Sequence, residues 1–259
     1  IAAQTELTRK NPWFTIKNEG RVGLKDFDAV LMRKDPPFDA EYLYATHLLQ
    51  QAEREGARVL NKPQALRDHS EKLALMEFAQ FAAPTLVARD MQALRDFHAQ
   101  HRDVIFKPLD GMGGAGIFRV GADGLNLGSV IEQLSHNGTQ TIMAQRYLPA
   151  IAEGDKRVLL IGGQVVPYAL ARIPQDGEVR GNLAAGGLGV AMELSVRERE
   201  VAEYLAPILY ARGLHLVGLD MIGGMLTEIN VTSPTCFVEI SQQTGLNVAA
   251  LMMDALTLH

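Results

Sequence analysis

Two oxygen-bearing side chains occupy alternate positions in an apolar run near the end of the chain. In Leu226-Thr227-Glu228-Ile229-Asn230, Glu228 and Asn230 point to one face of an expected strand, and Ile229 points to the other. Carboxylate and amide oxygens suit Mg²⁺, which takes its remaining ligands from substrate phosphates and water. The plainer alternative is ordinary polar alternation on an exposed sheet face. Carboxylates in apolar strands are uncommon, however, unless they are paired or bind metal.

A third acidic residue, Asp220, lies on the preceding strand, and the Gly223-Gly224 turn decides which face it shares. A two-residue turn pairs Asp220 with Thr227 and directs it away from Glu228. A three-residue turn with a bulge pairs Asp220 with Glu228 instead. We predict the bulged form, in which Asp220, Glu228 and Asn230 make one metal site.

A glycine-rich segment, Asp110 to Gly116, contains a literal G-x-G-x-x-G. A dinucleotide-binding fold needs a helix directly after such a loop, but Ile117 to Val120 is strand-like, and no Gly-Lys-Ser/Thr closes a P-loop. A glycine loop between antiparallel strands fits better, since its backbone N–H groups can cover a triphosphate while Lys107 supplies positive charge. A glycine-rich turn beside a surface lysine is the alternative.

Composition narrows the class of protein. The 259 residues carry a net charge of −5 and a pI near 5.8, which argues against nucleic acid as the main partner. A single cysteine, Cys236, excludes an internal disulfide and predicts a cytoplasmic location, and no apolar run predicts a membrane span. No Cys–His or His–His spacing predicts a thiol nucleophile or a zinc site. The chain begins at Ile1, and we expect that it is incomplete or processed there.

The pattern of elements predicts an α/β start followed by an α+β remainder. Residues 1–25 show weak periodicity and are expected to be irregular, whereas strands at 29–32 and 59–60 flank a helix at 41–55. Beyond them we expect helices at 70–81, 91–100, 129–135, 196–212 and 248–256, and strands at 85–88, 104–108, 116–120, 141–145, 157–161, 164–172, 216–222 and 225–231.

Four segments in order, Met32 to Asp39, Lys107 to Gly114, Arg180 to Gly187 and Thr227 to Cys236, strongly resemble bacterial glutathione synthetase from about residue 26 onward. The resemblance implies the ATP-grasp fold, in which two α+β lobes enclose ATP behind a partial N-terminal α/β domain. It further implies a substrate and dimerisation domain at 1–68, a small lobe with the glycine loop at 69–148, and a large lobe with the metal and acyl-phosphate site at 149–259.

The same resemblance implies ATP-dependent ligation of γ-glutamylcysteine to glycine through an acyl phosphate, with Mg²⁺ or alternatively Mn²⁺, in a homotetramer. It assigns Asp220, Glu228 and Asn230 to the metal. It assigns to ATP the residues Lys72, Lys107, Gly113, Gly114, Gln145, Arg146, Tyr147, Leu148 and Asp155. It assigns Arg157, Arg172 and Arg180 to catalysis, and to the substrates the residues Arg33, Asn182, Ser233, Pro234 and Thr235.

The sequence departs from the family pattern at two positions. Leu188 stands where the family usually has an arginine, so one phosphate- or substrate-facing charge is lost or is supplied by Arg180. Arg146 stands where the adenine-binding hinge of the family often has a neutral amide. Another ATP-grasp ligase with a different acid or amine is therefore an open alternative. A nucleotide-binding regulatory module without catalysis, and more remotely a dinucleotide oxidoreductase, are alternatives of other classes.

Overall fold

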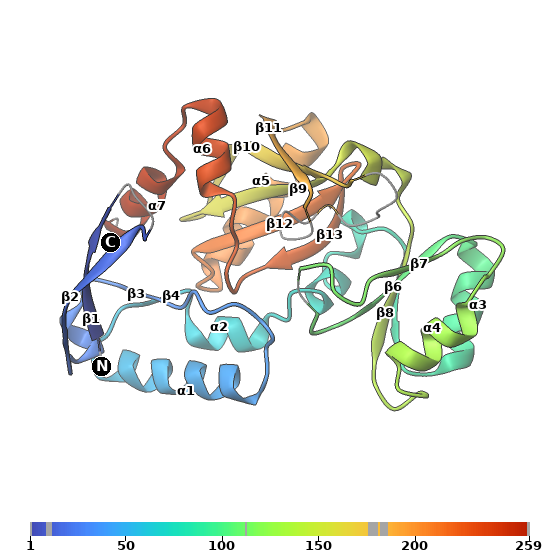
Figure 1. Ribbon diagram of the computed structural model, residues 1–259, viewed down its shortest axis with the longest axis horizontal. Helices are drawn as coiled ribbons and strands as arrows, with labels where there is room; N and C mark the ends of the chain where they lie inside the picture. Colours follow the sequence, from blue (N-terminus) through green and yellow to red (C-terminus); the bar gives the residue numbers. More distant parts are fainter. Residues whose placement is uncertain (1, 9–11, 112, 176–180, 182–185, 258–259) are drawn as a thin grey trace.

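The computed structural model describes residues 2–8, 12–111, 113–175, 181 and 186–257. Its N-terminal part contains two parallel strands, β3 (Val30–Leu31) and β4 (Val59–Leu60), joined by helix α1 (Ala40–Arg54). Helix α1 begins at Asp39, whose Oδ1 accepts a hydrogen bond from the Tyr42 N–H at 2.8 Å. Helix α2 (Pro63–Asp68) follows β4 and packs against α1 (Figure 1). The predicted strand–helix–strand unit is confirmed, and α2 was not predicted.

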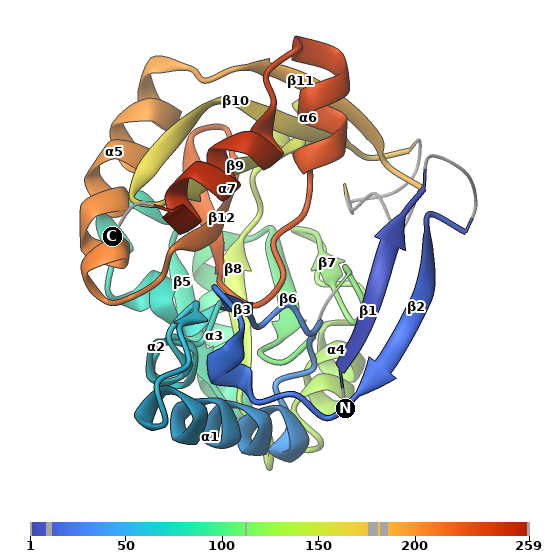
Figure 2. The same cartoon turned by 90° about the vertical axis from the view of Figure 1, so that its left-hand side faces the viewer.

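The expectation that residues 1–25 are irregular was wrong for the part that the structure describes. Strands β1 (Ala2–Leu7) and β2 (Phe14–Gly20) form an antiparallel hairpin that stands apart from the main body in Figure 2. Nearly all of its residues are exposed. Because neither face of the hairpin is buried, its sequence carries too little apolar alternation for strands to be predicted from it.

A four-stranded antiparallel sheet, ordered β5-β8-β6-β7, forms the small lobe. Its strands are β5 (Thr85–Ala88), β6 (Val104–Pro108), β7 (Phe118–Val120) and β8 (Ile142–Arg146). Helices α3 (Met91–His101) and α4 (Leu127–Leu134) pack against it around the buried Leu94, Phe106 and Ile131 (Figure 1). The glycine loop connects two antiparallel strands, β6 and β7, as predicted.

The large lobe is built on a five-stranded antiparallel sheet, ordered β11-β10-β9-β12-β13. Both faces of this sheet carry buried apolar side chains. On β9, Val158 and Leu160 pack in the core that includes α5, and Leu159 and Ile161 pack in the core that includes α6 and α7 (Figure 2). The elements are β9 (Asp155–Ile161), β10 (Gln164–Ile173), β11 (Leu188–Glu193), α5 (Val196–Ala211), β12 (Leu216–Ile222), β13 (Met225–Asn230), α6 (Phe237–Thr244) and α7 (Val248–Thr257). Of the large-lobe elements just given, β11 and α6 were not predicted.

The segment between the N-terminal part and the small lobe is not the helix predicted for residues 70–81. It contains two short 3₁₀ turns, η2 (Leu73–Met76) and η3 (Ala79–Phe81). The Glu71 carbonyl accepts a hydrogen bond from the Ile229 N–H at 3.1 Å, which holds this segment against β13 instead of in a continuous helix. The apolar residues Leu75 and Phe78 of this segment are nevertheless buried in the large-lobe core. Their spacing is what made the segment resemble an amphipathic helix.

Within the described part of the chain, no helix is long and apolar enough to cross a membrane.

Candidate active site

One cavity lies where the small lobe, the large lobe and the connecting segment around Lys72 meet. It brings together groups that are up to 200 positions apart in the sequence, from Asp35 to Thr235. The predicted site residues that line it are Lys72, Lys107, Gly113, Gly114, Gln145, Arg146, Tyr147, Leu148, Asp155, Arg157, Arg172, Asp220, Glu228, Asn230, Ser233 and Thr235. Two further predicted residues, Arg33 and Pro234, contact each other beside it, with the Arg33 Nη2 donating to the Pro234 carbonyl at 2.8 Å.

Arg180 and Asn182, together with Met112 of the glycine loop, lie outside the described residues. Gly181 is described and is buried. A Cβ atom at Gly181 would collide with the backbone carbonyl of Arg172, so only glycine permits this approach to β10.

The hairpin of β12 and β13 has the predicted pairing, but its bulge lies within β13 and not in the turn. Asp220 pairs with Glu228, which confirms the bulged register. The turn at Gly223-Gly224 has only two residues, however, because Ile222 pairs with Met225. The extra residue is Thr227, inside β13, and its Oγ1 donates to the Asp220 carbonyl at 3.1 Å. The bulge therefore sets which side chains share the cavity face.

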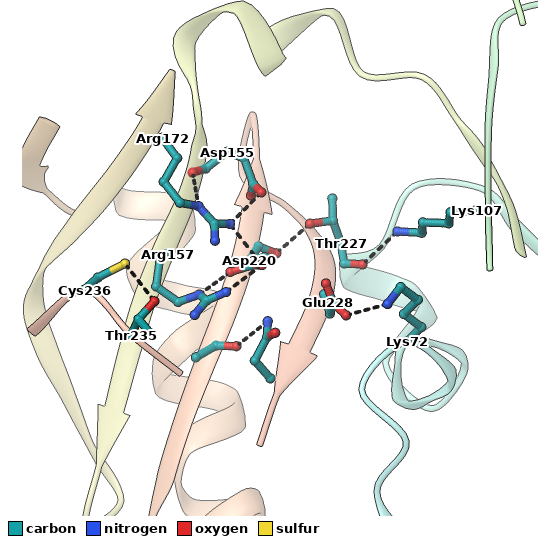
Figure 3. A network of polar contacts seen from close by, with 12 residues as sticks. Lys72, Lys107, Asp155, Arg157, Arg172, Asp220, Thr227, Glu228, Thr235 and Cys236 are labelled. Carbon is teal, nitrogen blue, oxygen red and sulfur yellow. Dashed lines mark hydrogen bonds and ion pairs between the residues drawn. The ribbon is translucent and has the colours of Figure 1, made fainter. Parts of the chain in front are cut away.

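Four charged groups alternate in sign along the sheet: Arg157, Asp220, Arg172 and Asp155 (Figure 3). Arg157 donates to both carboxylate oxygens of Asp220, from Nε to Oδ1 and from Nη2 to Oδ2 at 3.0 Å. The Nη2 of Arg172 lies 2.9 Å from Asp220 Oδ2 and 2.5 Å from Asp155 Oδ2. Burial opposes ionisation of Asp220, but the two guanidinium groups outweigh it and hold the pKa of that carboxyl well below its usual value.

Asp155 is less completely paired than Asp220. Its Oδ1 is buried without a hydrogen-bond partner among the described residues. Burial raises the pKa of Asp155 to about 6, against the opposing effect of Arg172. A buried polar atom without a partner in a cavity wall is a place where a ligand hydroxyl or amine can bind.

The two predicted phosphate-binding lysines both line the cavity and approach β13 from the same side in Figure 3. The Nζ of Lys107 lies 3.4 Å from both Gln145 Oε1 and the Thr227 carbonyl, and burial lowers the pKa of its amine. Lys72 donates from Nζ to the Gly111 carbonyl at 2.7 Å and to Glu228 Oε1 at 2.9 Å. Lys72 thus joins the glycine loop to β13.

The donor set fits a hard divalent cation at Glu228 and Asn230. The Asn230 Nδ2 donates to the Gly218 carbonyl at 3.3 Å, which leaves the amide oxygen of Asn230 as an acceptor. Both oxygens of Asp220 already accept from arginines, so it would have to share an oxygen with a metal. No group of three His, Cys, Asp or Glu side chains suited to a metal occurs within the described ranges. A Mg²⁺ ion that takes most of its ligands from phosphates and water needs no such group.

The turn Ser233-Pro234-Thr235, which is predicted to contact substrate and is called the substrate turn below, follows β13. It contacts the N-terminal part through Arg33 and through Asp35 Oδ1, which accepts from Ser233 Oγ at 2.5 Å. Cys236 comes next and is buried at the start of α6, and burial raises the pKa of its thiol. A protonated, buried thiol agrees with the prediction that Cys236 is no nucleophile.

Sequence reasoning missed two acidic residues that line the cavity, Asp35 and Glu71. Asp35 lies in the segment Met32 to Asp39, directly after Arg33-Lys34, so its position in that segment could have indicated a site residue. Glu71 precedes Lys72 in a segment that reads as an amphipathic helix, on which an acidic residue is ordinarily a solvated one. Only the pairing of that segment with β13 shows that Glu71 faces the site.

Solved structures with a similar fold include D-cycloserine synthetase DcsG, with a TM-score of 0.69 at 20% identity over 92% of this chain and 87% of that one. The ATP-grasp ligase PsnB, complexed with a minimal precursor, Mg and ADP, gives a TM-score of 0.61 at 23% identity over 98% of this chain and 84% of that one. Residues 71–245 also match the family described as "Prokaryotic glutathione synthetase, ATP-grasp domain". The chain is an ATP-dependent ligase with the ATP-grasp fold.

The N-terminal residues 1–67 match a second family description, "Prokaryotic glutathione synthetase, N-terminal domain". The glutathione synthetase of Ralstonia nicotianae is 67% identical over 247 residues, which are 95% of this chain and 76% of that protein. The glutathione synthetase of Nitrosomonas europaea is 63% identical over 244 residues, with 94% and 76% covered. The chain belongs to the prokaryotic glutathione synthetase family.

Proposed function

We propose that the chain joins γ-glutamylcysteine to glycine at the expense of ATP, giving glutathione, ADP and phosphate. Membership of the family and high identity to relatives named for this reaction support the assignment. One structural observation carries it: Lys72, Lys107, Arg157 and Arg172 converge on a single cavity that also contains Glu228 and Asn230. Transfer of a phosphoryl group needs such a concentration of charge more than it needs a protein nucleophile.

The reaction consists of two displacements. A carboxylate oxygen of γ-glutamylcysteine attacks the γ-phosphorus of ATP, and ADP leaves with the electron pair of the broken bond. The glycine nitrogen, after loss of a proton, then attacks the acyl carbon, and phosphate leaves. In this proposal Lys72 and Lys107 neutralise the triphosphate, and Arg157 and Arg172 stabilise the acyl phosphate. Arg180, outside the described residues, is the further cation assigned to this step.

Residues 145–148 are proposed to hold adenine through backbone groups. The N–H groups of Arg146 and Tyr147 already donate to the Pro84 and Asp103 carbonyls, each at 2.9 Å. Gln145 lies between β5 and β6 in the sheet, and the Leu148 carbonyl accepts from the Ile151 N–H at 3.0 Å. Adenine is therefore left to the other backbone groups of this hinge, chiefly the Leu148 N–H. Asp155, with its buried Oδ1, is proposed as a nucleotide contact. Gly113 and Gly114, both with positive φ, are proposed to let the glycine loop cover the phosphates.

Mg²⁺, or Mn²⁺ in its place, is proposed to be held by Glu228 and Asn230, with Asp220 sharing an oxygen. When bound, the ion would neutralise phosphate charge. Arg33, Asn182 and the substrate turn are proposed to hold the peptide and glycine. The hydrogen bond from Arg33 to the Pro234 carbonyl supports this proposal, because it connects the N-terminal part with the substrate turn.

The test is ATP hydrolysis by the purified protein with γ-glutamylcysteine, with and without glycine, and mass spectrometry of the product. We expect ADP release that depends on glycine and formation of glutathione, and we expect Glu228→Gln to abolish both. Glu132→Gln is the matched control, because Glu132 is an exposed carboxylate in the small lobe whose nearest ion-pair distance, to Arg95, is 3.8 Å. ADP release with other acid–amine pairs, but not with this one, would contradict the assignment of substrates.

A cytoplasmic location, a homotetramer and the domain limits 1–68, 69–148 and 149–259 are further proposals. The single buried cysteine and the acidic composition support a reducing compartment and the absence of nucleic-acid or membrane partners. Multi-angle light scattering of the full chain should give four times the 28.3 kDa monomer mass, and a monomer mass would contradict the tetramer.

A further inference from the structure

Glu71 is a partly buried carboxylate in the cavity wall that neither the proposed phosphate chemistry nor the proposed metal site uses. It lies in the segment between α2 and η2, directly before Lys72, and lines the cavity. Burial raises the pKa of Glu71, and the nearby Glu228 raises it further, against hydrogen bonds that lower it. A carboxylate kept in such a position, next to a second one, needs a compensating set of contacts.

Those contacts all go to the end of β13. The Glu71 Oε1 accepts three hydrogen bonds: from the Val231 N–H at 2.8 Å, the Thr232 N–H at 3.0 Å and the Thr232 Oγ1 at 2.9 Å. The backbone carbonyl of Glu71 accepts from the Ile229 N–H at 3.1 Å. A single residue therefore binds the backbone one position before Asn230 and one position after it.

The geometry has two consequences for the neighbouring groups. Asn230 is fixed between two anchored amides, so its side-chain oxygen has a defined position in the cavity. The substrate turn starts at Ser233, immediately after the Thr232 amide that Glu71 binds. The adjacent residue, Lys72, binds Glu228 on the same strand. Glu71 and Lys72 together hold both ends of the segment 228–232.

We propose that Glu71 is a positioning residue, whose carboxylate oxygen aligns Asn230 for the metal and the substrate turn for the amine substrate. It acts as a hydrogen-bond acceptor for β13, and its negative charge is not what the site requires of it. The inference rests on the proposed function in one respect, since it takes Asn230 and the substrate turn as parts of the metal and amine sites.

The test compares Glu71→Ala with Glu71→Gln, because glutamine retains an amide oxygen that can accept the same hydrogen bonds. The first readout is the affinity of the ADP-saturated protein for Mn²⁺, measured by electron paramagnetic resonance. We expect Glu71→Ala to weaken Mn²⁺ binding by about 10-fold or more, as loss of a group that orients a ligand does, and Glu71→Gln to stay within about threefold of the unchanged protein. Glu77→Ala, at an exposed carboxylate of the same segment, should change nothing.

The second readout is steady-state turnover, in which we expect Glu71→Ala to raise the KM for glycine more than it lowers kcat. Thr232→Val removes one of the three donors at nearly constant volume and should weaken Mn²⁺ binding in the same direction, so the idea is tested even if Glu71→Ala does not fold. Unchanged Mn²⁺ binding in Thr232→Val or in folded Glu71→Ala would overturn the proposal. So would a loss in Glu71→Gln as large as that in Glu71→Ala.

The two assignments fail separately. If the unchanged protein makes no glutathione while Glu71→Ala still weakens Mn²⁺ binding, the substrate assignment is wrong and the positioning role stands. If glutathione forms and Mn²⁺ binding does not respond to Glu71, the positioning role is wrong.

Discussion

Replacing Asp220 by asparagine removes a carboxylate that the buried arginines Arg157 and Arg172 share. Arg157, Arg172 and Asp220 are only 6%, 4% and 4% exposed. Asparagine keeps the shape of the side chain but loses the charge, and its amide N–H group would face guanidinium N–H groups. Arg172 would retain Asp155 at 2.5 Å, whereas Arg157 would have no acidic partner within the described ranges.

We expect Asp220→Asn to lower the free energy of unfolding by about 3–5 kcal/mol, the cost of leaving a buried charge unpaired. The matched control is Asp103→Asn, because Asp103 also makes a two-pronged ion pair, with Arg119 at 2.7 and 2.9 Å. That pair is 33% and 40% exposed, so its loss should cost less than about 1 kcal/mol.

The assay is urea unfolding followed by far-UV circular dichroism, in EDTA and without nucleotide. With equal m-values, a shift of the midpoint reports a difference in stability. Equal, small shifts for the two variants would refute the view that Asp220 anchors the arginines. A loss of stability for Asp220→Asn that occurs only with Mg²⁺ and nucleotide would instead identify Asp220 primarily as a metal ligand.

Two further predictions concern a glycine and a histidine. Gly218→Ala places a carbon 2.7 Å from Arg157 Cδ and 2.9 Å from Pro234 Cβ, so we expect kcat to fall by about 100-fold through displacement of these groups. Gly20→Ala, where no atom lies within 4 Å of the added carbon, is the control, and equal kcat values would contradict the prediction. Burial and Arg212 lower the pKa of His69 from 6.5 to about 4. The folded protein therefore binds this proton less readily than the unfolded chain, and stability should fall as pH drops through that interval. We expect the unchanged protein to lose on the order of 3 kcal/mol more than His69→Gln between about pH 7 and 4 in urea titrations, and parallel pH profiles would exclude His69 as the cause.

Most elements that bury an apolar face could be predicted from the sequence, and the short helices α2 and α6 are exceptions. The strands from 216–222 and 225–230 and helix α1 coincide with the predicted ranges to within one residue, because each carries a long apolar pattern. The hairpin β1–β2 has no buried face, and strand β11 has only partly buried residues at its centre, so neither shows a clear alternation. The prediction of a helix at residues 70–81 was wrong for the opposite reason. Their apolar spacing is helical, but backbone pairing with β13 decided their conformation.

For the candidate site, the types of residue that line the cavity could be predicted from the sequence more accurately than the contacts between their side chains. The pairing of Asp220 with Glu228 was predicted with a three-residue bulged turn, but the turn has two residues and the bulge lies at Thr227, which the Gly223-Gly224 turn alone could not locate. That Asp220 would bind two arginines depends on β9 and β10 lying beside β12 in one sheet. Non-local pairing of this kind leaves no mark in a single sequence.

In the proposed mechanism the acid substrate is activated as an acyl phosphate in the cavity between Lys107 and Glu228. The decisive experiment supplies γ-glutamylcysteine labelled with ¹⁸O in both oxygens of its cysteinyl carboxylate, together with ATP and glycine. We expect one ¹⁸O atom to pass into the released phosphate for each glutathione formed, because the bridging oxygen of the acyl phosphate leaves with phosphorus. Formation of glutathione with unlabelled phosphate would exclude an acyl phosphate intermediate.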